Sequence, residues 1–407
     1  MFVLTNNFWY NQVVSDCAMQ SKRGKMQKKI FIITGEHSGD IHASKVVDEL
    51  RKACPADTEL IIEGIGGENL KNSGVKLFSD QKKMSAVGFS FKMLFDHINL
   101  GARLVSYLKN EYKPDLVLLV DYGAFNLNIA KVLKKDNKDI NIFYYIPPQI
   151  WASRKWRINV IKKFVDKVLC IFPFEKKIYE DKGIETHYCG HPLSSHLPAP
   201  VDRNEFFEKH NLDKSKKLVS IFPGSRVFEL KSLMKTFVKT ANTLKKMHPD
   251  VQFLISHAPN LSDNAFNQYL KDSEFTVIKG ENHAMLSVSD ALILASGTVA
   301  LEACLYKTPM VISYRGPWLI YLIYLAVRCI KRVSLPNIIA DRDIVPELIQ
   351  SKSRPDLIAY NIEKLLYDAE YRVNYIKELS AVKDLLSDKN SAYEAANQII
   401  NNVTKSN

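Results

Sequence analysis

Short apolar runs, each followed by a polar turn and then by a segment of helical periodicity, recur along the whole chain. The clearest runs occupy residues 30–34, 116–120, 218–222 and 291–294. Runs of this length suit buried strands, and strands that alternate with helices build parallel sheets. We therefore expect an α/β fold of doubly wound, Rossmann-like sheets, in which ligands bind at the carboxyl ends of the strands.

The length of the chain indicates two such units. A chain of 407 residues is long for one hydrophobic core and sufficient for two, and prolines mark a connector at 194–200. Polar residues interrupt any apolar signal core at the start, so a disordered or misassigned leader is expected there. The predicted order is a leader over 1–27, an N-terminal domain over 28–195, a C-terminal domain over 196–375 that faces it across a cleft, and helices over 376–407 that pack back towards the N-terminal domain.

Charge and cysteine content limit the classes of partner. The net charge of +12 is spread over the whole length, which favours an anionic partner such as a phosphate-bearing substrate, a membrane surface or nucleic acid. Nucleic acid is not expected, because no RNP-like, zinc-finger or arginine-rich segment is present. The six cysteines are dispersed, as expected of reduced, buried thiols in a cytosolic protein. His187, Cys189 and His191 alternate at strand spacing, but we do not expect a metal site there.

The turn after residues 291–294 has the composition of a phosphate site. Ser296, Gly297 and Thr298 precede a helical segment, and a helix N-terminus offers free N–H groups and a positive dipole end. Glu302 lies one helical turn further on, from where a carboxylate can reach a pair of sugar hydroxyls. The alternative is an ordinary βαβ crossover in which Thr298 caps the helix and Glu302 is a first-turn acid.

A second candidate for phosphate binding is the turn after residues 218–222. Gly224 and Ser225 permit close approach of the backbone to a ligand, and the fork of the Arg226 guanidinium matches phosphate oxygens. The alternative is a surface turn with a solvated arginine. Further on, Asp341 and Asp343 form a D-x-D pattern, which we interpret as capping a helix at 344–350 rather than as a metal site.

Polar side chains also follow the first strand. Glu36, Ser38, Gly39 and Asp40 crowd the turn after residues 30–34, and we expect them to contribute to a site at the sheet edge. The alternative is a tight turn capped by Ser38 or Asp40. The spacing is not G-x-G-x-x-G, so a dinucleotide site is not supported.

Asp121 is the best candidate for a general base. It directly follows the apolar strand 116–120, and Gly123 lets the chain turn sharply after it. A carboxylate in that position projects into the crevice of an open sheet. The alternative is that Asp121 caps a helix at 126–135. A stiff loop at 147–152 then leads into a basic patch at 154–157.

Residues 84–108 carry more apolar surface than one packed helix face needs. Flanking lysines and an arginine suggest a segment that enters a membrane surface or covers an acyl chain; a buried core helix is the alternative. A second apolar run, 318–327, is too short to span a bilayer. The residues expected to contact membrane or acyl chains are Val87, Phe89, Phe91, Met93, Leu94 and Phe95.

The chain resembles the lipid-A-disaccharide synthases, glycosyltransferases of the two-Rossmann-domain (GT-B) type, over about residues 28–400. Many motifs stand in the family's order, which makes chance an unsatisfactory explanation. They are GEHSGD (35–40), KPDLVLLVDYGAFN (113–126), PPQIWA (147–152), PFE (173–175), GHP (190–192), FPGSR (222–226), ASGTVALE (295–302) and SLPN (334–337).

The resemblance implies an inverting transfer from UDP-2,3-diacylglucosamine to 2,3-diacylglucosamine 1-phosphate, giving a β(1→6) disaccharide and UDP without cofactor or metal. It implies a cytoplasmic protein peripherally bound to the anionic inner membrane, and it leaves a homodimer open. By resemblance, Asp121 matches the catalytic aspartate. Arg226 and the 296–298 turn match donor diphosphate contacts, and Glu302 and Asn337 match positions near the nucleoside. The 35–40 turn, Asn126 and Gln149 would lie on the acceptor side.

One departure from the family pattern is Ala124, which stands where a second aspartate is common. The resemblance therefore leaves Asp121 as the lone base. Two alternatives remain: a UDP-sugar 2-epimerase, which has a soluble substrate and needs no apolar segments, and a non-catalytic lipid-binding protein, which does not need Asp121, Arg226 and Glu302 at one cleft.

Overall fold

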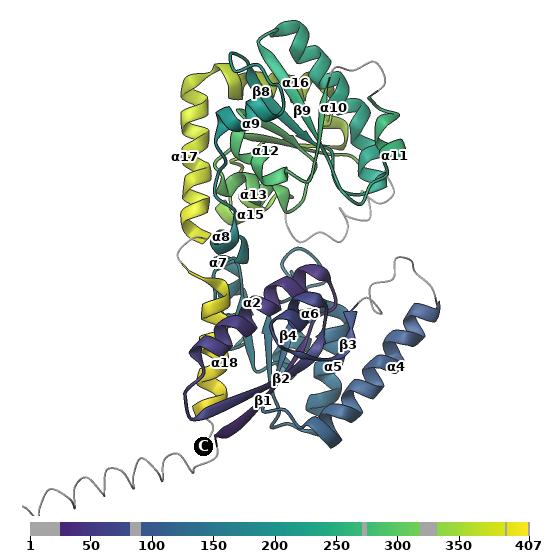
Figure 1. The fold of residues 1–407 in the computed structure, drawn as a ribbon, viewed down its shortest axis with the longest axis vertical. Helices are drawn as coiled ribbons and strands as arrows, with labels where there is room; N and C mark the ends of the chain where they lie inside the picture. The colour runs from purple at the N-terminus through teal and green to yellow at the C-terminus, as the bar shows by residue number, and fades with distance from the viewer. Residues whose placement is uncertain (1–24, 82–90, 271–274, 318–331, 387–388, 406–407) are drawn as a thin grey trace, which may run out of the picture.

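The computed structural model describes residues 25–81, 91–270, 275–317, 332–386 and 389–405. They form two lobes, each built on one parallel sheet (Figure 1). The predicted α/β class with two doubly wound sheets is confirmed. None of the helices in these ranges is both long and apolar enough to cross a bilayer.

The sheet of the first lobe, called here the N-lobe, has the strand order β3-β2-β1-β4-β5-β6-β7. The order reverses between β1 and β4, the switch point at which open sheets bind ligands. Strand β1 begins at Met26, inside the predicted leader, and residues 1–24 lie outside the described part. The strands are β1 Met26–Ile33, β2 Thr58–Gly66, β3 Lys76–Asp80, β4 Leu116–Val120, β5 Asn141–Tyr145, β6 Lys167–Cys170 and β7 Thr186–Tyr188.

Helices cover both faces of this sheet, which explains why its central strands are apolar without alternation. Ile30 and Ile32 pack with α2 on one face, whereas Phe31 and Ile33 pack with α4 and α5 on the other. The helices of this lobe are α2 His37–Ala53, α3 Glu68–Asn72, α4 Phe91–Tyr107 with the π-helical turn η2 Leu108–Tyr112, α5 Gly123–Asp136, α6 Arg157–Phe164, α7 Pro173–Glu180 and α8 Pro192–His196.

The second lobe, called here the C-lobe, has the strand order β10-β9-β8-β11-β12-β13, with its own reversal between β8 and β11. Its strands are β8 Lys217–Phe222, β9 Val251–His257, β10 Thr276–Lys279, β11 Ala291–Leu294, β12 Met310–Tyr314 and β13 Glu347–Ile349. Its helices are α9 Arg203–Lys209, α10 Val227–Met247, α11 Asp263–Asn267, α12 Asn282–Val288, α13 Val299–Leu305, α15 Leu335–Ala340, the 3₁₀ turn η3 Gln350–Lys352 and α16 Pro355–Tyr367.

The helix predicted at 344–350 does not form. The chain continues there into the edge strand β13, which pairs with β12, so tertiary pairing decides the conformation. Asp341 and Asp343 cap nothing at that position; both form ion pairs with Arg332.

The end of the chain returns from the C-lobe to the N-lobe. Helix α17 Ala369–Leu386 packs on α13, and α18 Ser391–Lys405 packs on α2. In Figure 1 these two helices, in yellow, run along one side of both lobes. Glu394 of α18 lies 2.7 Å from His187 Nε2, and Ser391 lies 2.7 Å from the Tyr145 hydroxyl. The division of the chain at residues 195 and 375 stays a prediction.

Candidate active site

The polar turns singled out in the sequence follow β1, β4, β8 and β11, the four strands at the two switch points. After β1, Gly35 is required by close packing, because a Cβ there would lie 2.2 Å from the ring of Tyr122. Glu36 occupies the N-cap position of α2 without a side-chain capping bond. Ser38 is exposed. Gly39 is buried, and a Cβ on it would lie 3.7 Å from the Cβ of Asp121.

The backbone at Asp121 is held in a conformation that non-glycine residues seldom adopt. Asp121 and Tyr122 have φ values of 50° and 49°, a strained arrangement that clusters at functional sites. The carbonyl of Asp121 accepts hydrogen bonds from the Tyr144 hydroxyl at 2.7 Å and from Asn126 Nδ2 at 2.8 Å. The turn is thus fixed from beneath while the side chain lines a cavity.

Asp121 does not cap α5, whose N-cap position is Tyr122. Its carboxyl group is half-buried. Burial raises the pKa of Asp121 above its ordinary value, and the backbone N–H of Tyr122 opposes this shift. A raised pKa makes the carboxylate a stronger base, as expected of a group that accepts a proton from an alcohol.

The charges of Asp121 and Arg226, which come from different lobes, both affect the pKa of Glu36. Burial is the main cause of the raised pKa of Glu36; the charge of Asp121 raises it further, and the charge of Arg226 lowers it. Since charges influence one another mainly within about 10 Å, Glu36 lies within electrostatic range of one residue from each lobe.

The turn after β8 is organised by a residue that the sequence analysis missed. One oxygen of the buried Glu229 accepts from the backbone N–H of Ser225 at 3.0 Å and of Arg226 at 3.1 Å, and the other lies 3.1 Å from Arg226 Nη1. Gly224, at φ 103°, has no room for a Cβ beside this carboxylate. Glu229 therefore occupies the two N–H groups expected to meet phosphate, whereas the side chain of Arg226 is 71% exposed.

Among the described residues, the turn after β11 has no such internal partner near its glycine. Gly297, at φ 152°, faces open space, and Thr298 is exposed while Ser296 is half-buried. Thr298 occupies the N-cap position of α13 without a side-chain capping bond. Glu302 is half-buried; burial raises its pKa, and the nearby His283 opposes the shift.

Three residues expected to contact substrate have hydrogen-bond partners within the protein. The amide of Asn337 is buried and uses all its hydrogen-bonding positions, on Ile344, Val345 and Glu347. Asp40 is buried in α2 and accepts from the backbone N–H groups of Gly67, Asn69 and Leu70. Asn126 is buried beneath the Asp121 turn, where Nδ2 also approaches the ends of β1 and β4.

The loop 147–152 packs beside the Asp121 turn. A Cβ on Gly123 would lie 2.7 Å from the ring of Pro148, and Trp151 Nε1 donates to the buried Glu175 at 2.8 Å. Gln149 is exposed on this loop. Behind it, Arg154 and Arg157 line the cavity next to Asp121, and Arg157 Nε is buried without a hydrogen-bond partner in the described part of the chain.

A cavity of about 1360 Å³ opens at Glu36 and Asp121 and extends between α4 and α5. Its walls include Ile98, Val105, Phe125, Ile129 and Val132, so most of the surface available to a ligand is apolar. Of the predicted lipid-contact residues, Phe95 is 62% exposed on α4. The side chains of Phe91, Met93 and Leu94 are not described, and Val87, Phe89 and the run 318–327 lie outside the described residues.

The described residues contain no group of three or more His, Cys, Asp or Glu side chains arranged to hold a metal ion. The alternating residues at the end of β7 have separate partners. His187 pairs with Glu394, Cys189 is buried, and His191 Nδ1 accepts from the backbone N–H of Leu193 at 3.2 Å.

Solved structures show which fold the two lobes build. A UDP-GlcNAc 2-epimerase from Neisseria meningitidis bound to UDP-GlcNAc matches with a TM-score of 0.58 at 14% identity, covering 93% of this chain and 100% of that one. The kitacinnamycin glycotransferase matches with a TM-score of 0.61 at 12% identity, covering 93% and 99%. At such identities the likeness shows the fold alone, the GT-B fold that glycosyltransferases and sugar-nucleotide epimerases share.

Sequence similarity then selects one family within this class. The family model for lipid-A-disaccharide synthetase matches residues 30–403. The lipid-A-disaccharide synthase of Trichlorobacter lovleyi is 34% identical over 93% of this chain and 98% of its own length, and that of Geobacter sulfurreducens is 34% identical over 88% and 93%. The chain belongs to the lipid-A-disaccharide synthase family. It is a glycosyltransferase of lipid A disaccharide synthesis, as its motifs predicted.

Proposed function

We propose that the protein transfers the sugar of UDP-2,3-diacylglucosamine to the 6-hydroxyl of 2,3-diacylglucosamine 1-phosphate with inversion, releasing UDP. The observation that carries this proposal is the apolar cavity lined by the half-buried Asp121 and by Glu36, whose pKa the charge of Arg226 from the other lobe lowers. A water-soluble sugar nucleotide has no need of such a cavity, whereas an acylated sugar does.

In the proposed reaction Asp121 takes the proton of the acceptor hydroxyl. The hydroxyl oxygen forms a bond with the anomeric carbon of the donor while the bond from that carbon to the diphosphate oxygen breaks. The leaving UDP gains negative charge, which a nearby guanidinium stabilises. Arg226 is suited to this role because most of its side chain is exposed while Glu229 holds one end of the guanidinium.

On the donor side, the exposed turn of Ser296, Gly297 and Thr298 supplies backbone N–H groups at the start of α13. Glu302, held near His283, is placed to accept hydrogen bonds from sugar hydroxyls. The backbone N–H groups of Ser225 and Arg226 already donate to Glu229. The turn at 296–298 is therefore the better source of N–H groups for the diphosphate.

On the acceptor side, the cavity between α4 and α5 receives an acyl chain. Arg154 and Arg157 line it close to Asp121, and the buried Nε of Arg157 lacks a partner in the described part of the chain. A buried donor without a partner is costly, so these two arginines are suited to the acceptor's 1-phosphate. Glu36 lines the same cavity, and Ser38 and Gln149 are further exposed polar groups on the acceptor side.

We also propose that the protein is cytoplasmic and binds peripherally to the anionic inner membrane. Phe95 and Ile98 of α4 are 62% and 58% exposed, and Ile98 also lines the cavity. Exposed apolar side chains beside a lipid cavity, on a protein of net charge +12, favour a lipid surface as the source of substrate. Helix α4 lies at the outer edge of the N-lobe (Figure 1).

Asp121→Asn tests the proposed chemistry. The variant is expected to lose about 10²–10⁴-fold in kcat while its affinity for UDP stays near that of the wild type, because the amide cannot accept the proton. Arg226→Ala is the complementary variant and is expected to weaken UDP binding. Mass spectrometry of the product from the two lipid substrates and calorimetry with UDP provide the measurements.

Near-wild-type turnover of Asp121→Asn would refute the assignment of the base. The same assay separates the other functions. Conversion of UDP-GlcNAc to its 2-epimer without acceptor would favour an epimerase, and binding of acylated acceptor without UDP release would favour a lipid-binding protein.

A further inference from the structure

The cavity between α4 and α5 has a regular inner wall. On α4 and η2 the lining residues recur at helical spacing. They are His97, Ile98, Gly101, Ala102, Val105, Ser106, Lys109 and Asn110. From His97 to Lys109 this wall extends about 18 Å, at about 1.5 Å per residue. One end of the cavity is therefore at the candidate active site and the other is at Lys109.

The opposite wall is α5, which runs in the same direction. Near Gly101 the two helices are close, since a Cβ there would lie 3.5 Å from Ile129 and 3.7 Å from Phe125. Phe125, Ile129 and Val132 continue the wall from Asp121 towards Asp136. The cavity is thus an apolar channel that is open to solvent along one side, at Ala102, Ser106 and Val132, and its length follows the two helices.

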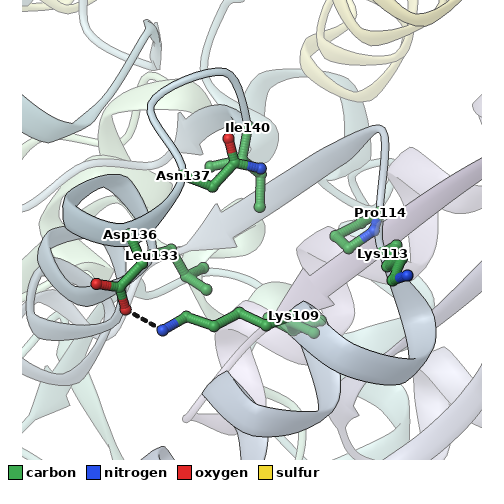
Figure 2. Close-up of a pocket in the computed structure, with 8 residues that line it drawn as sticks. Lys109, Lys113, Pro114, Leu133, Asp136, Asn137 and Ile140 are labelled. Carbon is green, nitrogen blue, oxygen red and sulfur yellow. Dashed lines mark hydrogen bonds and ion pairs between the residues drawn. The ribbon is translucent and has the colours of Figure 1, made fainter.

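The channel ends at an ion pair. Lys109 lines the channel and also a second cavity of about 390 Å³, whose lining includes Leu108, Pro114, Leu133 and Ile140. Lys109 Nζ pairs with the carboxylate of Asp136, which belongs to the lining of the second cavity (Figure 2). Lys109 lies in the π-helical turn η2, a conformation frequent at functional positions.

We propose that the Lys109–Asp136 pair closes the channel and sets the longest acyl chain that the acceptor can carry. This inference rests on the proposed function. The stem of Lys109 offers apolar wall to a chain that fits, and its ammonium stays with Asp136. A longer chain must displace this pair or leave its end in water. At about 1.1–1.2 Å per bond of an extended chain, the 18 Å wall accommodates about fifteen carbon–carbon bonds.

The test is a series of acceptors that differ only in acyl chain length, assayed with one donor in mixed micelles of fixed composition. For the wild type, kcat/KM is expected to rise with each added methylene, by up to about fourfold, and to fall beyond a cutoff. Lys109→Ala joins the two cavities, so its cutoff is expected to move to chains longer by two or more methylenes. Val132→Phe fills part of the channel between Asp121 and the ion pair. Its cutoff is expected to move to shorter acyl chains.

Lys131→Ala is the matched control, because Lys131 is an exposed lysine of α5 that lines neither cavity; its profile is expected to equal that of the wild type. Misfolding lowers the rates for all chain lengths alike, whereas a change of channel length moves the cutoff. If disaccharide forms and Lys109→Ala leaves the cutoff unchanged, the role of the ion pair is overturned. If no disaccharide forms with any acceptor, the proposed function fails instead.

Discussion

Single residues near Asp121 combine strain with tight hydrogen bonding. Two consecutive left-handed residues, Asp121 and Tyr122, cost free energy that the surroundings must offset. Tyr144 and Asn126 do so by donating to the Asp121 carbonyl. The result is a carboxylate that is oriented before substrate arrives, which lowers the entropy lost on reaching the reactive geometry.

The raised pKa of Asp121 predicts at which pH the activity falls on acidification. A base must be deprotonated, and burial raises the pKa of Asp121, so kcat/KM is expected to fall on acidification at a higher pH than for an ordinary aspartate. Initial rates measured at constant ionic strength across acidic and neutral pH provide the test. Because acid also unfolds proteins, circular dichroism at each pH serves as the control. A fall of kcat/KM only at the pH at which a solvent-exposed aspartate is protonated would contradict the role of burial.

At the scale of elements, α18 completes one face of the N-lobe. Its apolar side chains pack on α2, and α2 begins directly after Glu36 at the site. Ser391 and Glu394 add polar contacts to β5 and β7. The helix therefore supports the strand and helix from which the acceptor-side turn projects.

Ile399→Ala tests this support. Ile399 is fully buried, and truncating a buried isoleucine costs about 2–5 kcal/mol of unfolding free energy. We expect a lower midpoint in urea unfolding. Tyr393→Ala is the control on the same helix, because Tyr393 is 48% exposed and exposed positions change stability by about 0.5 kcal/mol or less. Equal effects of the two substitutions would contradict the packing role of α18.

At the scale of the whole molecule, the proposed reaction has the C-lobe bind the donor and the N-lobe bind the acceptor. The turns of the C-lobe suit a diphosphate, and the N-lobe holds the apolar channel. The net charge of +12 acts on both substrates and on an anionic surface, and its effect weakens with salt.

Membrane association is expected to depend on α4. Phe95→Ser should weaken binding to vesicles that contain anionic lipid by about tenfold or more, because a phenylalanine gains about 1.5–3 kcal/mol on leaving water. Val373→Ser on α17 is the control, since Val373 is 67% exposed but lies on the C-lobe side. Cosedimentation at low and high salt provides the measurement. A loss of binding that is equal for both variants would place the contact elsewhere.

The sequence was sufficient for the fold class and for the family, because strand–turn–helix units and motif order are local properties. It also singled out Asp121 and Arg226, whose roles in catalysis and donor binding stay predictions; the charges of both affect the pKa of Glu36. The internal hydrogen bonds of Asp40 and Asn337 were not predicted, because their partners lie on other segments; Asp40, for example, bonds to residues 67–70. Such contacts leave no local pattern. The contact of Glu229 does have a local pattern, because a glutamate three residues after the N-cap residue Arg226 is typical of a capping box.

The helix expected at 344–350 failed for a related reason. The segment combines Pro346 with the β-branched Ile344, Val345 and Ile349, which favour a strand, and it pairs with β12 at the edge of the sheet. The channel between α4 and α5 could not be derived either, because its walls depend on how two helices pack. The apolar excess of residues 84–108 was the signal for it.

The crossing of α18 to the N-lobe has a consequence for how the protein is made. The ribosome releases β1 to α8 long before it releases α18, so the nascent N-lobe exposes the apolar face of α2 throughout elongation. That half cannot reach its final form as a separate cotranslational unit. A stalled chain ending before residue 389 is expected to be more sensitive to protease around α2 than the released protein.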